Sequence, residues 1–407
     1  MTRMINVAAT SKAGAQLRIL SIVEALTVTG PVKPLLTFSS LAQRGFAGHP
    51  RVSHALMTTR RRPSAEGAQS DPLYTAVRAA GLRYFAIPEH RAFDISVFSK
   101  MLPCIRQIRP DLVETHDCKS HFLFLILRML YRDLRELRWV AFHHGYTRTS
   151  WKVSTYQQLD RFTLPSADRV VTLCKPFAAM LARRGVDPGK LTVISNAIEA
   201  RERPPVAAVA EAREALGISS GESVILTVGR LSREKGQDDL ITAFQQTLAV
   251  SRGRRPRLVI AGDGPERARL EGLAARLGDR VVFAGHVADP WPLYHAADVF
   301  VLPSHSEGSP LVVLEAMSAH AAIVATTVGG VPETLADGQS ALLVPPRNPA
   351  ALSAALCRLL SDQALRDRLG RAALESVVTK FSAAGYAEKL LALYEAVLEV
   401  PADARAS

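Results

Sequence analysis

Short apolar runs alternate with amphipathic stretches along this chain, and the alternation begins twice. Most apolar runs lead into a polar or glycine-containing loop, after which a helical pattern follows. Parallel sheets covered by helices produce this order, so we expect an α/β fold with doubly wound sheets. The first loop is expected at 10–15 and the first helix at 16–26. The predicted strands are 5–9, 82–87, 112–116, 139–143, 170–173, 192–194, 223–228, 257–261, 280–284, 298–302, 323–326 and 341–344.

A proline-containing stretch separates the two rounds of alternation. Pro204 and Pro205 follow the last strand of the first round, and an alanine-rich segment comes next. The 407 residues exceed what one hydrophobic core usually covers. We therefore expect a Rossmann-like domain at 1–197, a linker at 198–220, a second Rossmann-like domain at 221–380 and a terminal helix at 381–407 that crosses back to the first domain.

Charge is divided unequally between the two halves. Residues 1–197 carry 28 Lys+Arg and 13 Asp+Glu, a net charge of +15, whereas residues 198–407 have a net charge of −3. Such asymmetry indicates two halves with different partners. The four cysteines show no metal-ligand spacing, and no signal-peptide pattern precedes the first predicted strand. We expect a cytoplasmic protein.

The stretch 303–333 contains a loop, a helix start and two glutamates. Ser309 is a good N-cap and Pro310 suits the first helical position. A strand that leads through a loop into a helix N-terminus makes an anion site. Glu307 and Glu315 lie eight residues apart around this turn. Taken alone, they also read as one surface glutamate and one helical glutamate.

The loop 229–236 places two cations after a predicted strand. Arg230 offers a planar fork and Lys235 a point charge, and both suit a phosphate. A solvated basic turn explains the loop equally well when it is taken alone. A dehydrogenase would need a GxGxxG loop at such a strand end, and neither this motif nor a P-loop is present.

Transfer of a sugar from a nucleoside diphosphate requires that the leaving group be neutralised. A divalent metal held by an Asp-x-Asp pair is the usual device, but the sequence has no such pair, and Asp238 and Asp239 are adjacent. Fixed cations opposite a helix N-terminus supply the same stabilisation. We therefore expect no metal and no cofactor.

Several segments, in this order and spacing, resemble the family 4 retaining glycosyltransferases of the GT-B fold. In the second half these are VGRLSREKG, AGDGP, FAGHV, ADVFVLPS and SEGSPLVVLEAMSAHAAIVATTVGGVPE. In the first half ETHDCKS, VAFHHG, LDRFTLPSADRVVTLC and VISNAIE are similar to family segments. The resemblance covers nearly the whole chain and implies two Rossmann-like domains that face each other across a cleft.

The resemblance also implies roles for individual residues. Glu307 would touch the donor sugar, Glu315 would bind the ribose hydroxyls, and Arg230 with Lys235 would bind the diphosphate. His144 would lie on the acceptor side, with His143 as the less favoured candidate. Glu307, His144, Arg230 and Lys235 form the expected catalytic set. The remaining donor-binding residues are expected to be Gly14, Gly262, His286, Val287, Gly308, Ser309, Leu311 and Val312.

Three positions depart from the family pattern. The family has two glycines after its first strand, whereas this chain has Ala13 and Gly14. The family's Asn-Gly pair is Asn196-Ala197 here, and its serine after the VVTL strand is Cys174. These departures lie away from the donor motifs.

The expected activity is transfer of a sugar from a UDP- or GDP-sugar to a hydroxyl acceptor, with retention of configuration. The acceptor is expected to be lipid-linked or a polysaccharide of the cell envelope. A phosphorylase or epimerase of the same fold, and a sugar-nucleotide-binding protein without activity, remain as alternatives. No nucleic-acid partner is expected.

An arginine series in the first half indicates an anionic membrane surface as a further partner. Arg128, Arg132, Arg135 and Arg138 are spaced so that one helix would carry them on one face, after the apolar run 122–127. Interfacial helices combine such features. An ordinary solvated helix face is the alternative interpretation.

Overall fold

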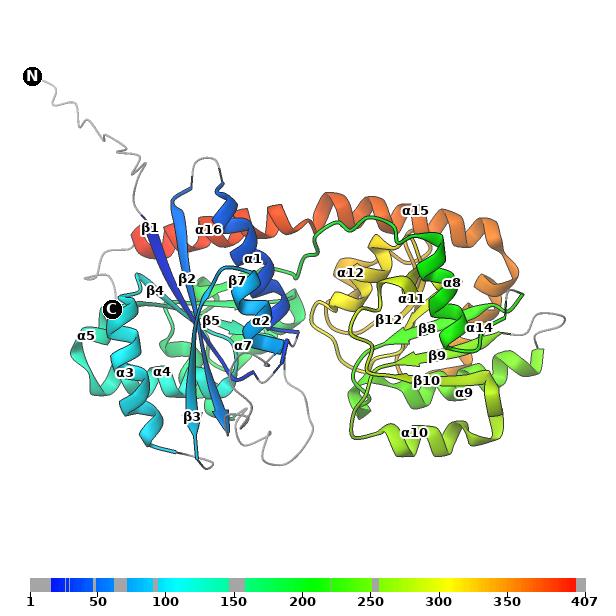
Figure 1. Ribbon diagram of the computed structural model, residues 1–407, viewed down its shortest axis with the longest axis horizontal. Helices are drawn as coiled ribbons and strands as arrows, with labels where there is room; N and C mark the ends of the chain where they lie inside the picture. The colour runs from blue at the N-terminus through cyan, green and yellow to red at the C-terminus, as the bar shows by residue number, and fades with distance from the viewer. Residues whose placement is uncertain are drawn as a thin grey trace, which may run out of the picture. The chain divides into compact units, whose positions relative to one another are not determined.

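The computed structural model describes residues 16–399, except for 26, 29, 47–48, 62–71, 91–93, 146–157, 220 and 251–255. The chain divides into two compact units. Unit 1 comprises residues 1–142, 166–169 and 387–407, and unit 2 comprises residues 143–165 and 170–386. Each is described by itself below (Figure 1).

The first sheet has seven strands in the order β3-β2-β1-β4-β5-β6-β7. β1 pairs in parallel with β2 and β4, and the pairs β2–β3, β4–β5 and β6–β7 are also parallel. The order reverses between β1 and β4, as in doubly wound folds. The strands are β1 (Gln16–Val23), β2 (Arg51–Arg61), β3 (Arg83–Glu89), β4 (Leu112–Thr115), β5 (Arg138–His143), β6 (Arg169–Thr172) and β7 (Leu191–Val193).

Helices alternate with these strands along the chain. They are α1 (Val32–Arg44), α2 (Pro72–Ala79), α3 (Ser96–Ile108), α4 (Cys118–Leu130), α5 (Arg132–Arg135) and α7 (Lys175–Arg183), with 3-10 turns η2 (Leu164–Ser166) and η3 (Pro188–Lys190). The side chain of Asp117 caps α4 by accepting from the N–H groups of Lys119 and Ser120. Residues 387–399 of the terminal helix α16 (Ala383–Glu399) belong to unit 1, where Tyr394 donates to the buried Glu114.

The second sheet has six strands in the order β10-β9-β8-β11-β12-β13, and each neighbouring pair is parallel. Its order reverses between β8 and β11. The strands are β8 (Val224–Val228), β9 (Arg257–Ala261), β10 (Val281–Gly285), β11 (Val299–Leu302), β12 (Ala322–Thr326) and β13 (Leu342–Val344).

Two apolar clusters cover the two faces of this sheet, because successive strand residues point to opposite sides. Phe300 packs with α11 and α12, whereas its neighbours Val299 and Val301 pack with α9 and α14. Figure 1 shows α11 and α12 above the sheet and α9 below it. The helices and turns are α8 (Val206–Ala215), η4 (Arg233–Lys235), α9 (Gln237–Val250), α10 (Arg267–Ala274), η5 (Ala275–Arg280), α11 (Trp291–Ala296), α12 (Leu311–Ser318), α13 (Val331–Thr334), α14 (Pro349–Ser361) and α15 (Gln363–Lys380).

The predicted helix over 16–26 is wrong. Residues 16–23 form β1, which pairs in parallel with both β2 and β4. Leu17, Ile19 and Leu20 are buried there. A short apolar run with β-branched residues serves as a buried strand as well as a helix, and periodicity alone does not separate the two. The predicted first strand at 5–9 and the loop at 10–15 lie outside the described residues.

The predicted arginine face is also wrong, because the four arginines lie on three different elements. Arg128 lies in the last turn of α4, whereas Arg132 and Arg135 belong to α5, and Arg138 begins β5 and is buried. Arg128 donates to the carbonyl of Arg135, and Arg135 donates to the carbonyl of Arg128, each at 3.0 Å. These bonds close the turn between α4 and α5. In the described part of the chain, no helix has the length and apolarity that a membrane span requires.

Candidate active site

The loops after β8 and β11 meet where the strand order of the second sheet reverses. Ligands of open α/β sheets bind at such a point, beyond the carboxyl ends of the strands. Lys235 donates to Oε1 of Glu307 at 2.7 Å, and the hydroxyl of Ser304 donates to the same oxygen at 2.6 Å. Two predicted site residues from separate loops are therefore in direct contact.

Burial differs between the members of this ion pair. The side chain of Glu307 is 7% exposed, whereas that of Lys235 is 28% exposed. A buried carboxylate requires such partners, because burial without them is costly. The exposed end of Lys235 remains accessible to an anion.

Arg230 is exposed at the start of the same loop. Its carbonyl oxygen accepts a hydrogen bond from Nε2 of Gln237 at 3.0 Å. Its guanidinium makes no hydrogen bond with any residue that the structure describes. The fork is therefore open to a phosphate.

Glycines allow the loop backbones to approach closely. A Cβ at Gly236, whose φ is +65°, would collide with the carbonyl oxygen of Pro303. A Cβ at Gly262 would collide with the carbonyl oxygen of Gly229. The N–H of Gly262 donates to the carbonyl oxygen of Gly285 at 2.7 Å, so this group holds the loops together.

His305 adds a second connection between the loops. Its ring Nε2 lies 2.8 Å from Oδ2 of Asp239, and its main-chain N–H donates to the carbonyl oxygen of Glu234 at 2.7 Å. The loop that carries Glu307 is thereby attached to η4 through Glu234 and to α9 through Asp239, and Lys235 is held beside Glu307.

The N-terminus of α12 differs from the prediction. The helix begins at Leu311 with Pro310 as its N-cap, and no side chain caps it. Ser309 is engaged elsewhere, because the main-chain N–H of Asn196 donates to its hydroxyl at 3.0 Å. The side-chain amide of Asn196 also donates to the carbonyl oxygen of Ser309 at 2.6 Å. The predicted capping role of Ser309 is therefore wrong.

These contacts leave the start of α12 open. Within the described chain, the N–H groups of Gly308, Ser309, Leu311 and Val312 have no hydrogen-bond acceptor. Helix N-termini with open N–H groups favour anions. A Cβ at Gly308 would come within 2.9 Å of the Phe177 ring, so the backbone is closely packed on that side.

Glu315 lies in the middle of α12 and contacts α11. The hydroxyl of Tyr294 donates to Oε2 of Glu315 at 2.7 Å. Burial, together with the negative charge of Glu315, raises the pKa of Tyr294 well above its ordinary value. The phenol therefore stays protonated and holds the carboxylate in one orientation.

Comparisons with known proteins identify the family of the chain. The model of the glycosyl transferases group 1 family matches residues 209–376, and that of the glycosyl transferase 4-like domain matches residues 13–197. A glycogen synthase from Mycobacterium tuberculosis is 30% identical over 303 residues, which cover 69% of this chain and 68% of that protein. The chain belongs to the group 1 glycosyltransferases.

Other relatives of this glycosyltransferase match over shorter segments. A D-inositol 3-phosphate glycosyltransferase from Acidothermus cellulolyticus is 38% identical over 251 residues, which cover 57% of this chain and 54% of that protein. The chain spans about half the length of several curated relatives that it matches.

Solved structures confirm the fold. The structure of Anabaena HepE in complex with UDP-glucose superposes with a TM-score of 0.77 at 19% identity, covering 93% of this chain and all of that chain. Together with the two parallel sheets, this confirms the predicted GT-B class for the glycosyltransferase.

The two histidines before Gly145 differ in burial. His143 is 3% exposed, and burial together with the positive charge of Arg184 lowers its pKa to about 4. His144 is half-buried at the end of β5. Gly145 has a φ of +101°, and a Cβ there would come within 2.8 Å of the Phe177 ring. His143 is thus a core residue, and the acceptor-side role of His144 stays a prediction.

Three further residues were expected to bind the donor. Gly14 precedes β1 instead of following the first described strand, and it lies outside the described residues. His286 is exposed directly after β10. Val287 packs partly against the apolar cluster that contains α11 and α12.

One group of side chains in the glycosyltransferase has the composition of a metal site. Asp238, Asp239 and His305 place ligand atoms within 4.8 Å of one another. However, Oδ2 of Asp238 accepts from Arg269 at 3.1 Å, and Asp239 is paired with His305. An arginine within the group opposes a bound cation, so these contacts favour a structural role.

Four residues of the site were missed from the sequence. Each of them positions a predicted residue or its loop, through a contact between segments distant in the sequence or through one that depends on the conformation of a loop. They are Asn196, Tyr294, Ser304 and His305. Asn196 was noted only as a departure from the family, and its distance of 113 residues from Ser309 carries no local pattern.

Proposed function

We propose that this protein is a retaining glycosyltransferase that moves a sugar from a nucleoside-diphosphate sugar to a hydroxyl acceptor. The observation that carries the proposal is the Lys235–Glu307 pair beside the open N-terminus of α12, at the reversal of the second sheet. A diphosphate there would meet Arg230, Lys235 and the N–H groups of α12. The UDP-glucose complex of HepE supports a donor of this class.

The roles of the cations follow from the charge that develops during transfer. The bond between the anomeric carbon and the diphosphate oxygen breaks, and negative charge grows on the diphosphate. Arg230 and Lys235 would stabilise this charge in place, without reorganisation at the moment of reaction. The acceptor oxygen would attack on the face that the diphosphate leaves, and a diphosphate oxygen would take its proton.

Glutamates would position the sugar nucleotide. Glu315, oriented by Tyr294, would accept hydrogen bonds from the two ribose hydroxyls. Glu307 would contact the sugar while it holds Lys235 near the diphosphate. His144 would lie on the acceptor side, and closure over the donor would exclude water and limit hydrolysis.

The donor proposal is tested with a panel of UDP- and GDP-sugars. We expect at least one of them to raise the melting temperature of the purified protein. The same radiolabelled donor should then give a labelled product when a membrane extract supplies the acceptor. Release of free sugar phosphate, or conversion to an epimeric nucleotide sugar, would instead indicate a phosphorylase or an epimerase.

We further propose a lipid-linked or polysaccharide acceptor and attachment to an anionic membrane surface on the cytoplasmic side. The net charge of +15 in residues 1–197 supports this proposal. Exposed Met129 and Leu130, next to Arg128 at the end of α4, add apolar surface among cations. The protein should sediment with lipid vesicles only when they contain anionic lipid, and the bound fraction should fall as salt shortens the Debye length. Equal sedimentation with neutral vesicles would contradict membrane attachment through charge.

A further inference from the structure

A cavity of about 580 Å³ lies in unit 2, at the edge of the second sheet where β11 and β12 begin. Its lining includes Asp298, directly before β11, and Ala321, directly before β12. Lys235 and Glu307 instead follow the ends of β8 and β11. The cavity therefore lies beyond the amino ends of the strands, and the candidate donor loops lie beyond their carboxyl ends.

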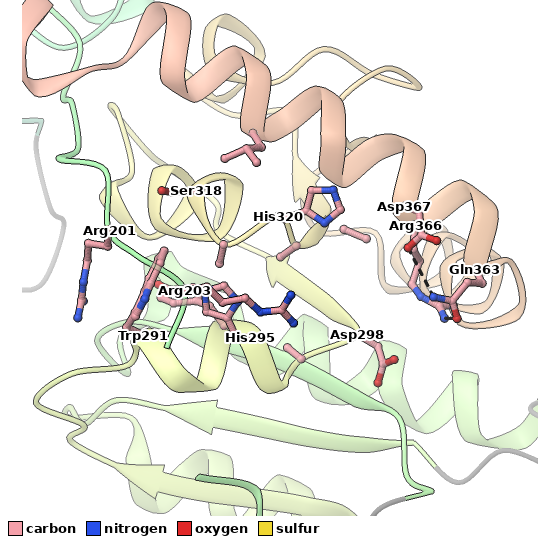
Figure 2. Close-up of a pocket in the computed structure, with 16 residues that line it drawn as sticks. Arg201, Arg203, Trp291, His295, Asp298, Ser318, His320, Gln363, Arg366 and Asp367 are labelled. Atoms are coloured by element: carbon pink, nitrogen blue, oxygen red, sulfur yellow. Dashed lines mark hydrogen bonds between the residues drawn. The ribbon is translucent and has the colours of Figure 1, made fainter. Parts of the chain in front are cut away.

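Cationic side chains from four segments converge on this cavity. Arg201 and Arg203 come from the segment before α8, His295 from α11, His320 from the residue pair after α12, and Arg366 from α15. Figure 2 shows Arg203, His295 and His320 between Arg201 on the left and Arg366 on the right. Burial lowers the pKa of His295, and the positive charges of Arg203, Arg201 and His320 lower it further. Like charges are thus close enough to repel one another.

Two of these cations already have partners. Arg201 makes a bidentate pair with Asp289, with both distances at 2.8 Å, and lies over the Trp291 ring. Arg366 donates to the carbonyl oxygens of Leu359 and Leu360. Arg366 therefore holds the end of α14, and its donors are largely used.

Among the residues that the structure describes, the Arg203 guanidinium and Nε2 of His295 have no hydrogen-bond partner, although the His295 ring packs edge-on against Trp291. Arg203 is exposed and makes no hydrogen bond with any residue in the described ranges. The Nε2 atom of His295 is buried and has no hydrogen-bond partner in the same part of the chain. A buried polar atom without a partner is rare, and the His295 ring would have to turn for Nε2 to reach a ligand in the cavity.

Acidic residues do not neutralise the cavity. Asp298 accepts from the main-chain N–H of Val224 at 2.8 Å, so its carboxylate is partly used by the backbone. Asp367 is exposed on α15 and lies beside Gln363. The five cationic or protonatable side chains thus outnumber the two carboxylates of the lining.

We propose that this cavity binds a small phosphate-bearing molecule of the sugar phosphate class, with Arg203, His295 and His320 around the phosphate. Arginine and histidine are suited to phosphate oxygens because they donate charge-assisted hydrogen bonds. The volume lies within the range of small-molecule sites and exceeds what a single phosphate ion needs. The cavity shares Tyr294 with the proposed donor site, whereas Lys235 and Glu307 lie beyond the other ends of the strands.

Calorimetric titration of the whole chain with glucose 6-phosphate tests the proposal. We expect one bound molecule per chain, and we expect saturating UDP or GDP to leave this binding in place. Inorganic phosphate should bind more weakly, and glucose should not bind. Absence of binding by both glucose 6-phosphate and inorganic phosphate at millimolar concentration would overturn the proposal.

Variants distinguish this cavity from the donor loops. Arg203→Gln combined with His320→Gln should weaken glucose 6-phosphate binding about 10- to 100-fold, since charge-assisted hydrogen bonds are lost. Both residues are exposed, so folding should be kept. Arg276→Gln, at another exposed arginine, should bind like the wild type, as should Arg230→Ala. The proposal would be overturned if Arg230→Ala lost glucose 6-phosphate binding while the Arg203→Gln, His320→Gln variant bound it like the wild type. That result would assign the phosphate to the donor loops.

Discussion

Glu315 is prepared for a ligand by the residue that holds it. The phenol of Tyr294 is protonated and donates to Oε2, so the carboxylate has one fixed orientation. Ribose presents two neighbouring hydroxyl groups, and a carboxylate can accept from both at once. An amide at this position retains only one oxygen acceptor.

Glu315→Gln should therefore weaken donor binding. The loss of a charged hydrogen bond corresponds to about 1.5–3 kcal/mol, and we expect the donor KM to rise by roughly 10-fold or more. Calorimetry with the preferred nucleotide measures the effect directly. Tyr294→Phe keeps the carboxylate but removes its support, so its effect should be smaller. Unchanged nucleotide affinity in Glu315→Gln would show that the ribose role is wrong.

At the scale of elements, the start of α12 depends on a contact with the segment after β7. Asn196 is 6% exposed, and it holds Ser309 through two hydrogen bonds. Because Pro310 provides no side-chain cap, this contact fixes the backbone from which the open N–H groups project. The geometry of the proposed diphosphate site at the start of α12 thus depends on Asn196, which lies outside the donor motifs.

Asn196→Ala should lower both stability and donor affinity. The buried carbonyl oxygen of Ser309 would lose its amide donor, which costs about 1–3 kcal/mol. Asn348→Ala is a matched control, because Asn348 caps α14 by accepting from Ala351 and its loss costs about 1 kcal/mol. Both variants should melt earlier, but only Asn196→Ala should raise the donor KM. Equal donor KM values in the two variants would contradict this positioning role.

The sequence predicted the elements of the second half well, and the reason is physical. Its strands are apolar runs bounded by glycine, proline or charged residues, and the predicted strand 257–261 agrees with the structure. The first half contains ambiguous segments. The run 16–23 has enough apolar residues for a strand or a helix, and β2 was missed because its arginine and threonine residues obscure an apolar pattern.

Site residues were predictable only where a motif or a loop charge announced them. The contact between Lys235 and Glu307 joins two such residues. Partners such as Tyr294 and Asn196 were not predictable, because their roles arise from packing between distant segments. The arginine series failed for a related reason, since Tyr131 is extended and ends α4 before the face is complete.

At the scale of the whole molecule, the proposed mechanism depends on two features. One is the unequal charge of the two halves, and the other is neutralisation of the diphosphate by cationic side chains instead of a metal ion. The half with net charge +15 is proposed to meet an anionic acceptor or membrane. The second half would neutralise its diphosphate with Arg230, Lys235 and the α12 dipole. No step of this proposal needs a divalent ion.

Transfer should therefore persist in EDTA. The sequence has no Asp-x-Asp pair. In the group of Asp238, Asp239 and His305, Asp238 accepts a hydrogen bond from Arg269, and Asp239 is paired with His305. We expect initial rates in EDTA to equal those in Mg²⁺. Asp239→Asn, which alters that group, serves as a control and should keep its activity independent of metal. Loss of activity in EDTA that Mg²⁺ or Mn²⁺ restores would contradict the cationic mechanism.

The rate of sugar transfer by the Arg230→Ala, Lys235→Ala double variant tests the central claim most directly. Removal of one preorganised stabiliser of developing charge typically costs about 2.7–4 kcal/mol, so each single change should slow transfer about 100- to 1,000-fold, and the double variant at least as much. Arg230 is exposed, but loss of Lys235 leaves the buried carboxylate of Glu307 with Ser304 as its remaining partner, so the melting temperature should fall and rates are compared well below it. A folded double variant with strongly reduced turnover is the predicted result, and near-normal turnover would contradict the account.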